Sequence, residues 1–192
     1  MKNISKYNDA TINFFFLTFP LSIIIGNFFI NLNVVLLCLF AFIFYTKKIL
    51  DFKLNIFDKI IIIFFLNILI VLIINFFQSY IGGENFSKII TVKSLLYLRY
   101  FILYIILRVL ISNNILNLRW FSLMSVLCAS FVCFDIFFQF SFGKNIFGIE
   151  AHSTRHYSGV FGAELVAGGY LQKFALFSLF LPFVLNQKKL KK

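Results

Sequence analysis

Residues 60–77 read IIIIFFLNILIVLIINFF, an apolar run without a charged side chain. A helix needs about 20 such residues to cross the roughly 30 Å hydrocarbon core of a bilayer. The whole chain has 192 residues, of which 61% are hydrophobic and only 13% charged, whereas a soluble domain carries about 25% charged residues. Run length and composition together predict a membrane protein.

Similar apolar runs occur on both sides of residues 60–77, separated by short polar stretches. The sequence therefore predicts an all-α fold, a polytopic transmembrane helical bundle that forms a single domain over residues 1–192. The expected crossings are residues 12–28, 31–45, 60–77, 91–111, 120–142 and 164–185, with a tight turn near Gly26 and an external loop at 143–163.

The net charge of +11 comes from basic residues at the ends of apolar runs. They are not interleaved with aromatic residues in stripes, so we expect no nucleic-acid partner. Most of the 18 basic residues fall on the same side as the N-terminus, while Arg99 lies inside a crossing. The positive-inside rule then predicts cytoplasmic termini and an outward-facing loop at 143–163.

Two polar residues interrupt the fifth crossing. Asp135 and Gln139 are four residues apart and share one helix face, with Asp135 about 10 Å below the outer boundary. Ionisable groups at such depth face a bundle interior or a wet cavity, and either a functional role or an interhelical hydrogen bond is expected. Arg99 lies at similar depth and is the expected partner of Asp135, whereas Arg108 lies near a membrane surface and can extend to water.

The outer loop carries a second polar group. Arg155 and His156 offer hydrogen-bond donors and a titratable ring, but no third ligand stands at metal spacing, so we expect neither a metal nor a cofactor. Glu164 is expected at the start of the sixth helix, where the helix dipole favours a carboxylate. Gly159 and Gly162 lie between these groups.

The stretches FDIFFQFSFGKNIFG (134–148) and RHYSGVFGAELVAGGYL (155–171) resemble the membrane glycosyltransferases of the O-antigen ligase/polymerase-like family. SLLYLRYFIL (94–103), which contains Arg99, is similar to a further pattern of that family. The resemblance implies transfer of a glycan from an undecaprenyl-diphosphate carrier to an acceptor sugar at the outer face of the bacterial inner membrane, in surface polysaccharide or lipopolysaccharide biosynthesis. The family's large external loop would follow the sixth crossing, so the chain is expected to correspond to the N-terminal half of such a protein.

This resemblance implies roles for the polar residues. Glu164 and His156 become the expected catalytic residues, and either Arg155 or His156 occupies the position of the family's loop arginine. The substrate-binding residues it implies are Arg155, Arg99, Asp135, Gln139, Gly159 and Gly162. The expected partners are a lipid-linked glycan donor, a sugar acceptor and membrane lipids. Two other hypotheses stay open from the residues alone, namely a transporter or flippase for a lipid-linked substrate and a non-catalytic membrane scaffold.

Overall fold

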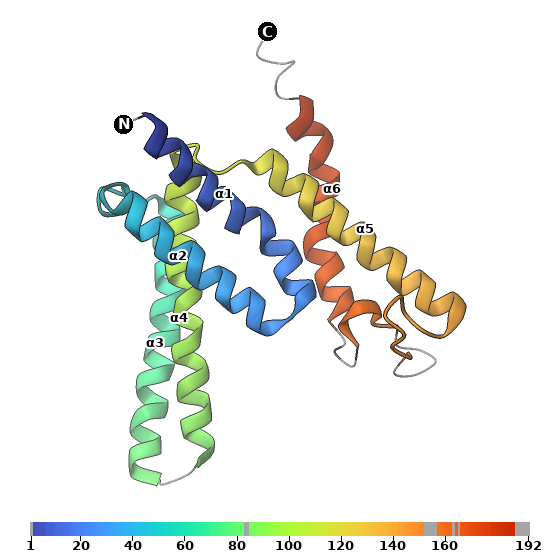
Figure 1. The fold of residues 1–192 in the computed structure, drawn as a ribbon. Helices are drawn as coiled ribbons and strands as arrows, with labels where there is room; N and C mark the ends of the chain where they lie inside the picture. The colour runs from blue at the N-terminus through green and yellow to red at the C-terminus, as the bar shows by residue number, and fades with distance from the viewer. Residues whose placement is uncertain (1, 83–84, 152–156, 163, 165, 187–192) are drawn as a thin grey trace. The chain divides into compact units, whose positions relative to one another are not determined.

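The computed structural model describes residues 2–82, 85–151, 157–162, 164 and 166–186, and the helices it contains are shown in Figure 1. Across these residues the secondary structure is helical, apart from an isolated bridge between Lys144 and Glu150. The predicted all-α fold is confirmed. The elements are α1 (Lys2–Ile25), α2 (Asn27–Leu50), α3 (Ile56–Gly82), α4 (Asn85–Ser112), α5 (Leu118–Phe142), the short 3₁₀ helix η1 (Gly159–Phe161) and α6 (Ala167–Asn186).

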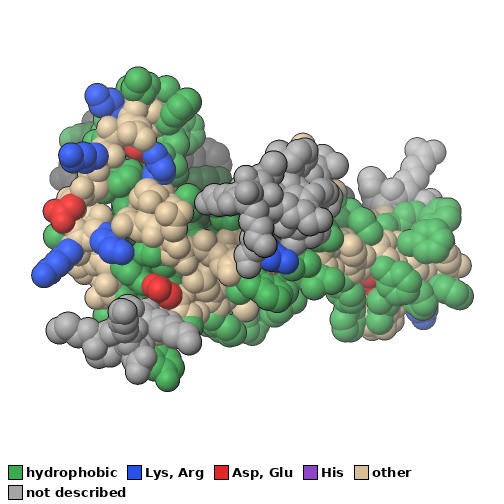
Figure 2. Space-filling model, turned by 90° about the horizontal axis from the view of Figure 1, so that it is seen from above, with side chains coloured by type: hydrophobic (Ala, Val, Ile, Leu, Met, Phe, Trp, Pro, Cys, Tyr) green, Lys and Arg blue, Asp and Glu red, His purple; other side chains and the backbone are tan. Residues whose placement is uncertain are grey.

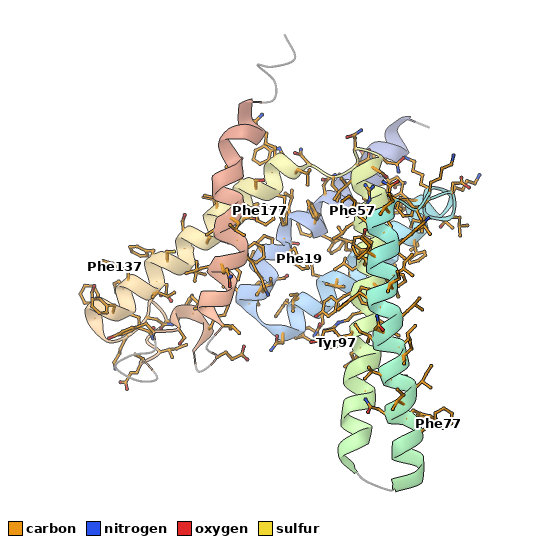
Figure 3. All side chains as sticks on the ribbon, turned by 180° about the vertical axis from the view of Figure 1, so that it is seen from behind. Phe19, Phe57, Phe77, Tyr97, Phe137 and Phe177 are labelled. Carbon is orange, nitrogen blue, oxygen red and sulfur yellow. The ribbon has the colours of Figure 1, made fainter. Side chains whose placement is uncertain are left out.

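Four described helical segments are long and apolar enough to cross a membrane, and they confirm a helical membrane protein. They are Tyr7–Ile25, Asn27–Leu50, Ile56–Phe77 and Leu118–Phe142. Hydrophobic side chains cover much of the described surface in Figure 2. Phe77 projects away from the α3–α4 pair and Phe137 projects away from α5 (Figure 3), and both rings are exposed. Such exposure suits side chains whose solvent is lipid.

The helix ends differ from the predicted boundaries in ways that local sequence explains. The turn between α1 and α2 is a single residue, Gly26, whose φ of 133° is open to glycine. Residue 45 has non-helical dihedrals inside α2, and the helix nevertheless continues to Leu50. The sixth helix begins at Ala167 and not at Glu164, because η1 and a further turn occupy the residues before it.

Helical packing divides the chain into two compact units, one formed by Met1–Leu37 with Leu116–Lys192, the other by Cys38–Ile115. In the first unit α5 packs on α1 and α6. The rings of Phe16 and Phe121 stack at 4.3 Å, and Phe177 meets Phe121 edge-on at 5.1 Å. Tyr170 of α6 donates its hydroxyl proton to the carbonyl oxygen of Pro20 at 3.1 Å. Aromatic stacking and this buried hydrogen bond hold α1, α5 and α6 together.

The second unit contains the paired helices α3 and α4. Phe65 and Phe101 lie 5.0 Å apart, ring centre to ring centre, along the pair. Most side chains of α3 are exposed, so the helix has little apolar burial of its own. Whether the two units form the single domain expected from the sequence stays a prediction.

Candidate functional site

The candidate site is built on the buried face of α5. Buried residues recur along this helix at intervals of three and four, which places them on one stripe. They include the small residues Ser125, Cys128 and Ala129, which allow the backbone of a neighbouring helix to come close. Asp135 and Gln139 continue this stripe, and both side chains are completely buried. Asp135 is therefore turned toward protein, but its carboxylate meets the loop that follows α5 at Ile146 and Gly159, and not another transmembrane helix as expected.

The chain reverses direction directly after α5. Gly143 adopts a left-handed conformation, φ 77°, and its N–H donates to the carbonyl oxygen of Gln139 at 2.9 Å. This arrangement is a common helix C-terminus, and glycine adopts it without a steric penalty. The exposed side chains of Lys144 and Glu150 then form an ion pair at 3.1 Å across the isolated bridge. Such exposed pairs contribute under about 1 kcal/mol, so the loop needs other interactions to hold it.

Asn145 supplies much of what holds the loop. Its side chain is buried, and its Oδ1 accepts hydrogen bonds from the N–H groups of Phe147 at 3.0 Å and Ile149 at 2.7 Å. Its Nδ2 donates to the carbonyl oxygen of Gly159 at 2.9 Å. One amide therefore satisfies three backbone groups and joins the first part of the loop to η1.

Asp135 and Gln139 fasten the same loop to α5. Asp135 Oδ1 accepts from the N–H of Ile146 at 2.9 Å. Gln139 Oε1 accepts from the N–H of Gly159 at 2.9 Å, and its Nε2 donates to the carbonyl oxygen of Ile149 at 3.3 Å. We call the hydrogen bonds of Asp135, Gln139 and Asn145 to the loop backbone the loop network. Backbone groups that water would otherwise solvate are satisfied here by side chains, as buried groups must be.

Gly159 lies where only glycine fits. Its φ is 56°, and a Cβ built on it would stand 2.8 Å from Asp135 Oδ2 and 3.1 Å from a side-chain carbon of Ile136. The missing side chain therefore lets η1 rest directly on α5. Asp135 Oδ2 is buried and has no hydrogen-bond partner among the described residues. One oxygen of this carboxyl group is therefore paired with the loop backbone and the other is not.

The structure brings three of the predicted site residues together: Asp135, Gln139 and Gly159. Gly162 ends η1 with a φ of 59°, and its N–H donates to the carbonyl oxygen of Gly159 at 3.3 Å. Glu164 is exposed and precedes α6 by three residues, so its expected place in the first turn of that helix is wrong. Arg155 and His156 lie outside the described residues.

Arg99 belongs to the other unit. Its Nη2 donates to the Tyr100 hydroxyl at 3.0 Å, and its guanidinium lies 4.8 Å from the centre of that ring. A cation over an aromatic face is weakly stabilised by the ring. The expected pairing of Arg99 with Asp135 stays a prediction.

Several buried polar residues had no role predicted from the sequence, and Asn145 and Asp58 are two of them. Asn145 lies in the stretch 134–148. Its position two residues after Gly143, which ends α5, is typical of a turn-forming asparagine. Asp58 is buried beside Tyr104 and Arg108, although the sequence placed it in a polar connection. Its three-residue spacing from Asn55 is the signal of a helix-capping pair.

These contacts show what the site can do chemically. Asp135 Oδ1, Gln139 and Asn145 bond to the loop backbone, so they hold residues 146–149 and Gly159 against the end of α5. Direct binding of a substrate by Asp135 or Gln139 stays a prediction. No cluster of three His, Cys, Asp or Glu side chains that could hold a metal ion occurs in the part of the chain that the structure describes.

Gln139 offers a test of this positioning role. Gln139→Leu should leave the N–H of Gly159 buried without an acceptor and lower the stability of the loop by about 1–3 kcal/mol. Gln139→Glu keeps an acceptor for Gly159 but loses the donor to Ile149, so it should lie between leucine and wild type. The rate of hydrogen exchange of the residue 159 amide measures the stability of the loop in both variants. Equal protection in wild type and Gln139→Leu would show that the loop does not depend on this side chain.

Comparison with protein-family models found no match, and comparisons with curated proteins and with solved structures also found none.

Proposed function

We propose that this chain forms part of a membrane glycosyltransferase that moves a glycan from undecaprenyl diphosphate to an acceptor sugar. The proposal rests on the similarity of residues 134–148 and 155–171 to the O-antigen ligase/polymerase-like enzymes. The observation that supports it is the loop network, which ties the polar loop to the buried end of α5. The proposal includes the bacterial inner membrane as the location, cytoplasmic termini, and a periplasmic face for residues 143–163.

The loop network suits a site that must grip a diphosphate. Residues 143–151 are fixed by Asn145 and Asp135, and η1 is fixed by Gln139. The segment 152–156 therefore runs between two stretches of chain that are each fastened to α5. A ligand-binding segment whose flanking residues are already ordered loses less conformational entropy when it meets its ligand.

Charge also favours Arg155 as the group that binds the carrier. Lys144 on the same loop is already engaged by Glu150. A guanidinium presents several N–H donors in one plane, which suits the oxygens of a diphosphate better than a point charge does. In the proposed reaction the acceptor hydroxyl attacks the anomeric carbon, the bond to the diphosphate oxygen breaks, and undecaprenyl diphosphate leaves. The hydroxyl proton passes to His156 or to the carboxylate of Glu164.

Binding of undecaprenyl diphosphate to the full chain in lipid nanodiscs tests the donor site. Arg155→Ala should raise the dissociation constant by about tenfold or more, because a hydrogen bond to a charged group contributes about 1.5–3 kcal/mol. Arg155→Lys should recover only part of the affinity. Lys144→Ala is the matched control, since it removes a cation from the same loop and should change the affinity less than twofold. Undecaprenol, which lacks the diphosphate, should bind every variant equally.

Two results would count against the proposal, and a third experiment tests the role of Glu164. Wild-type affinity in both Arg155→Ala and His156→Ala would remove the donor site. Transbilayer movement of a fluorescent lipid-linked oligosaccharide in vesicles that contain the protein would favour a transporter instead. In cells that make the protein, Glu164→Gln should keep donor binding but reduce the transferred glycan on gels, and unchanged glycan would exclude Glu164 from the chemistry.

A further inference from the structure

Helix α3 carries a polar residue at the middle of its membrane span. Asn67 lies midway along the span Ile56–Phe77 and is exposed. Its Nδ2 donates to the carbonyl oxygen of Ile63 in the same helix at 3.0 Å, and the described residues provide no partner for its second Nδ2 proton or for Oδ1. A carboxamide at this depth has no bulk water to pair with, so it favours a partner on a neighbouring helix.

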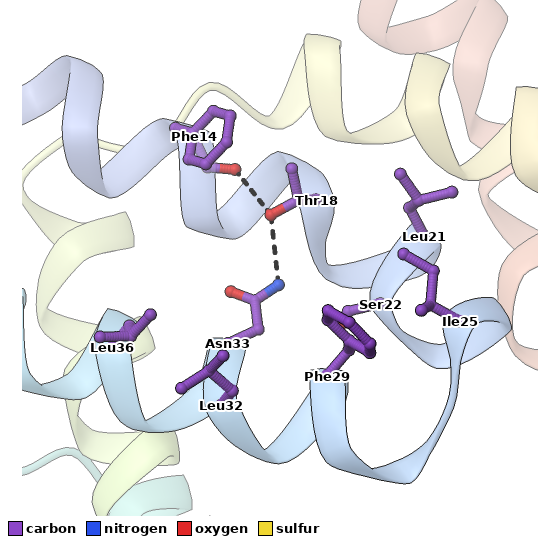
Figure 4. Close-up of a pocket in the computed structure, with 9 residues that line it drawn as sticks. All are labelled: Phe14, Thr18, Leu21, Ser22, Ile25, Phe29, Leu32, Asn33 and Leu36. Atoms are coloured by element: carbon purple, nitrogen blue, oxygen red, sulfur yellow. Dashed lines mark hydrogen bonds between the residues drawn. The ribbon is translucent and has the colours of Figure 1, made fainter.

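Asn33 shows how this chain pairs an asparagine between two of its own helices. Asn33 of α2 is buried, and its Nδ2 donates to Thr18 Oγ1 of α1 at 3.2 Å (Figure 4). Helices α1 and α2 thus form within one chain the kind of interhelical hydrogen bond that Asn67 lacks among the described residues.

The groove beside Asn67 has the form of a helix-packing hole. It is an open groove of about 360 Å³ that is lined by Phe64, Asn67, Ile68 and Val71 of α3 and by Tyr97 of α4. The four α3 residues stand at positions i, i+3, i+4 and i+7. Four residues at this spacing form the hole that receives one side chain of a facing helix in a coiled coil. The lining of the groove therefore suits a helix as its occupant.

An exposed apolar stripe continues along α3 on both sides of Asn67. Alternating steps of four and three residues connect the exposed side chains of this stripe, which are Ile60, Phe64, Asn67, Val71 and Ile74. A repeat of 3.5 residues keeps one seam of a helix against a partner helix over several turns. Phe65 lies outside the stripe and packs against Phe101 of α4 at 5.0 Å. The stripe is therefore available to a helix from outside the α3–α4 pair.

The position of Asn67 selects a second copy of this chain as the occupant. Copies of one chain insert into a membrane with the same orientation, so the α3 helices of two copies are parallel and a two-fold axis relates them. In a parallel pair in register, a side chain at the second apolar position of the repeat enters a hole of four residues. That hole contains the same residue of the partner and the residues three before, one after and four after it. For Asn67 these residues are Phe64, Asn67, Ile68 and Val71, which line the groove.

We propose that this chain forms a parallel homodimer through the stripe of α3, in which Asn67 of each copy enters the groove of the other copy. The two carboxamides face each other, and each donates its free Nδ2 proton to the Oδ1 of the other. The interface is independent of the proposed glycan transfer, because none of its residues belongs to the loop network. Loss of the dimer and loss of donor binding are therefore separate results.

Energy transfer between fluorescently labelled copies of the full chain measures the dimer. The copies are placed in phosphatidylcholine vesicles at a series of protein-to-lipid ratios, which gives a dissociation constant. Asn67→Leu should raise this constant about tenfold, as expected for loss of hydrogen bonds between helices in a membrane. Asn67→Gln keeps a self-complementary amide and should raise the constant less than Asn67→Leu does.

A second pair of substitutions tests the hole. Val71→Trp overfills the groove and should also raise the dissociation constant about tenfold. Ile73→Trp is the matched control, because Ile73 and Val71 are both 50% exposed but only Val71 belongs to the lining of the groove. The control should change the constant less than twofold.

Disulfide cross-linking tests the register of the two helices. The background variant has its three cysteines, Cys38, Cys128 and Cys133, replaced by alanine. In this background Val71→Cys should give a disulfide-linked dimer when copper phenanthroline oxidises the two thiols. Ile73→Cys points to another side of α3 and should stay monomeric under the same conditions.

Four results would overturn the proposal. They are a monomer at every protein-to-lipid ratio, equal dissociation constants for the wild type and Asn67→Leu, equal cross-linking from Val71→Cys and Ile73→Cys, and exclusive labelling within one chain by a benzophenone placed at residue 71. The last result would show that another segment of the same chain covers the groove.

Discussion

Asp58→Ala is expected to destabilise the α3–α4 pair, because removal of the carboxylate leaves the Tyr104 hydroxyl, the Asn55 N–H and the Arg108 guanidinium without their shared partner. Asp58 is 1% exposed. Its carboxylate accepts from the Tyr104 hydroxyl and from the N–H of Asn55 at 2.7 Å, and it meets Arg108 Nε at 3.4 Å. One side chain therefore caps the start of α3 and joins it to α4.

Graded variants separate these contributions. Tyr104→Phe removes one hydrogen bond and should cost about 1 kcal/mol. Asp58→Asn keeps an acceptor for Tyr104 and Asn55 but loses the charge, so it should fall between wild type and alanine. Asp51→Ala removes an exposed carboxylate from the same connection and should stay within about 0.5 kcal/mol of wild type.

Unfolding in mixed detergent micelles, followed by far-ultraviolet circular dichroism, gives these free energies. Hydrogen exchange in α3 and α4 then shows whether the loss is local to the second unit. If Asp58→Ala is no less stable than Asp51→Ala, the cluster contributes nothing to the pairing. The Arg108 side chain is 33% exposed and also contacts Asp58. Its extension to water stays a prediction.

Gly159→Ala is expected to detach η1 from α5 and to open the loop, with a cost of about 3 kcal/mol or more. A non-glycine residue in the left-handed region costs about 1–2 kcal/mol. The added methyl group would also stand 2.8 Å from Asp135 Oδ2, closer than carbon and oxygen atoms pack. Either the Asp135 carboxyl group or the backbone at residue 159 must then shift. A shift of the backbone breaks the hydrogen bond from its N–H to Gln139.

Gly148→Ala is the matched control for Gly159→Ala. Gly148 has a similar positive φ of 81°, but nothing lies within 4 Å of the position its Cβ would take. It should therefore show the backbone penalty of about 1–2 kcal/mol alone. The rate of limited proteolysis in the loop and the hydrogen exchange of residues 146 and 159 report local opening. Equal effects of the two substitutions would mean that contact with Asp135 is unimportant.

A double-mutant cycle isolates the contact. Asp135→Ser shortens the side chain and removes the oxygen that the new methyl group would meet. In that background Gly159→Ala should cost about 1 kcal/mol less than in the wild type, since residues in contact are not additive. If the free-energy costs of the two substitutions simply add, the methyl group at residue 159 clashes with Ile136 and not with Asp135.

The burial of Asp135 and Gln139 was predictable, but their partners were not. The four-residue spacing already places both side chains on one helix face, and the cost of exposing them to lipid turns that face inward. Their partners are backbone groups of Ile146, Ile149 and Gly159, which meet α5 only because the loop folds back after Gly143. The path of a loop depends on which folded arrangement satisfies the most backbone groups, and local pattern does not contain that information.

For Asp58 even the burial was not predictable from the sequence. Its neighbours Lys53 and Lys59 make residues 46–59 look like a solvated connection. Burial of this carboxylate requires Tyr104 and Arg108 of α4, far along the chain. Only the pairing of α3 with α4 brings a donor and a cation to the same point.

What the sequence by itself determined is the number, type and approximate extent of the helices. The thickness of hydrocarbon and the helical rise set the length of an apolar run, and both act on contiguous residues such as 60–77. Only the tertiary structure decided that Asn145 joins the loop to η1 and that Gly159 must lack a side chain. Each of these depends on atoms that meet from separate segments, because hydrogen bonds and steric contacts act over a few ångströms in space whatever the distance along the chain.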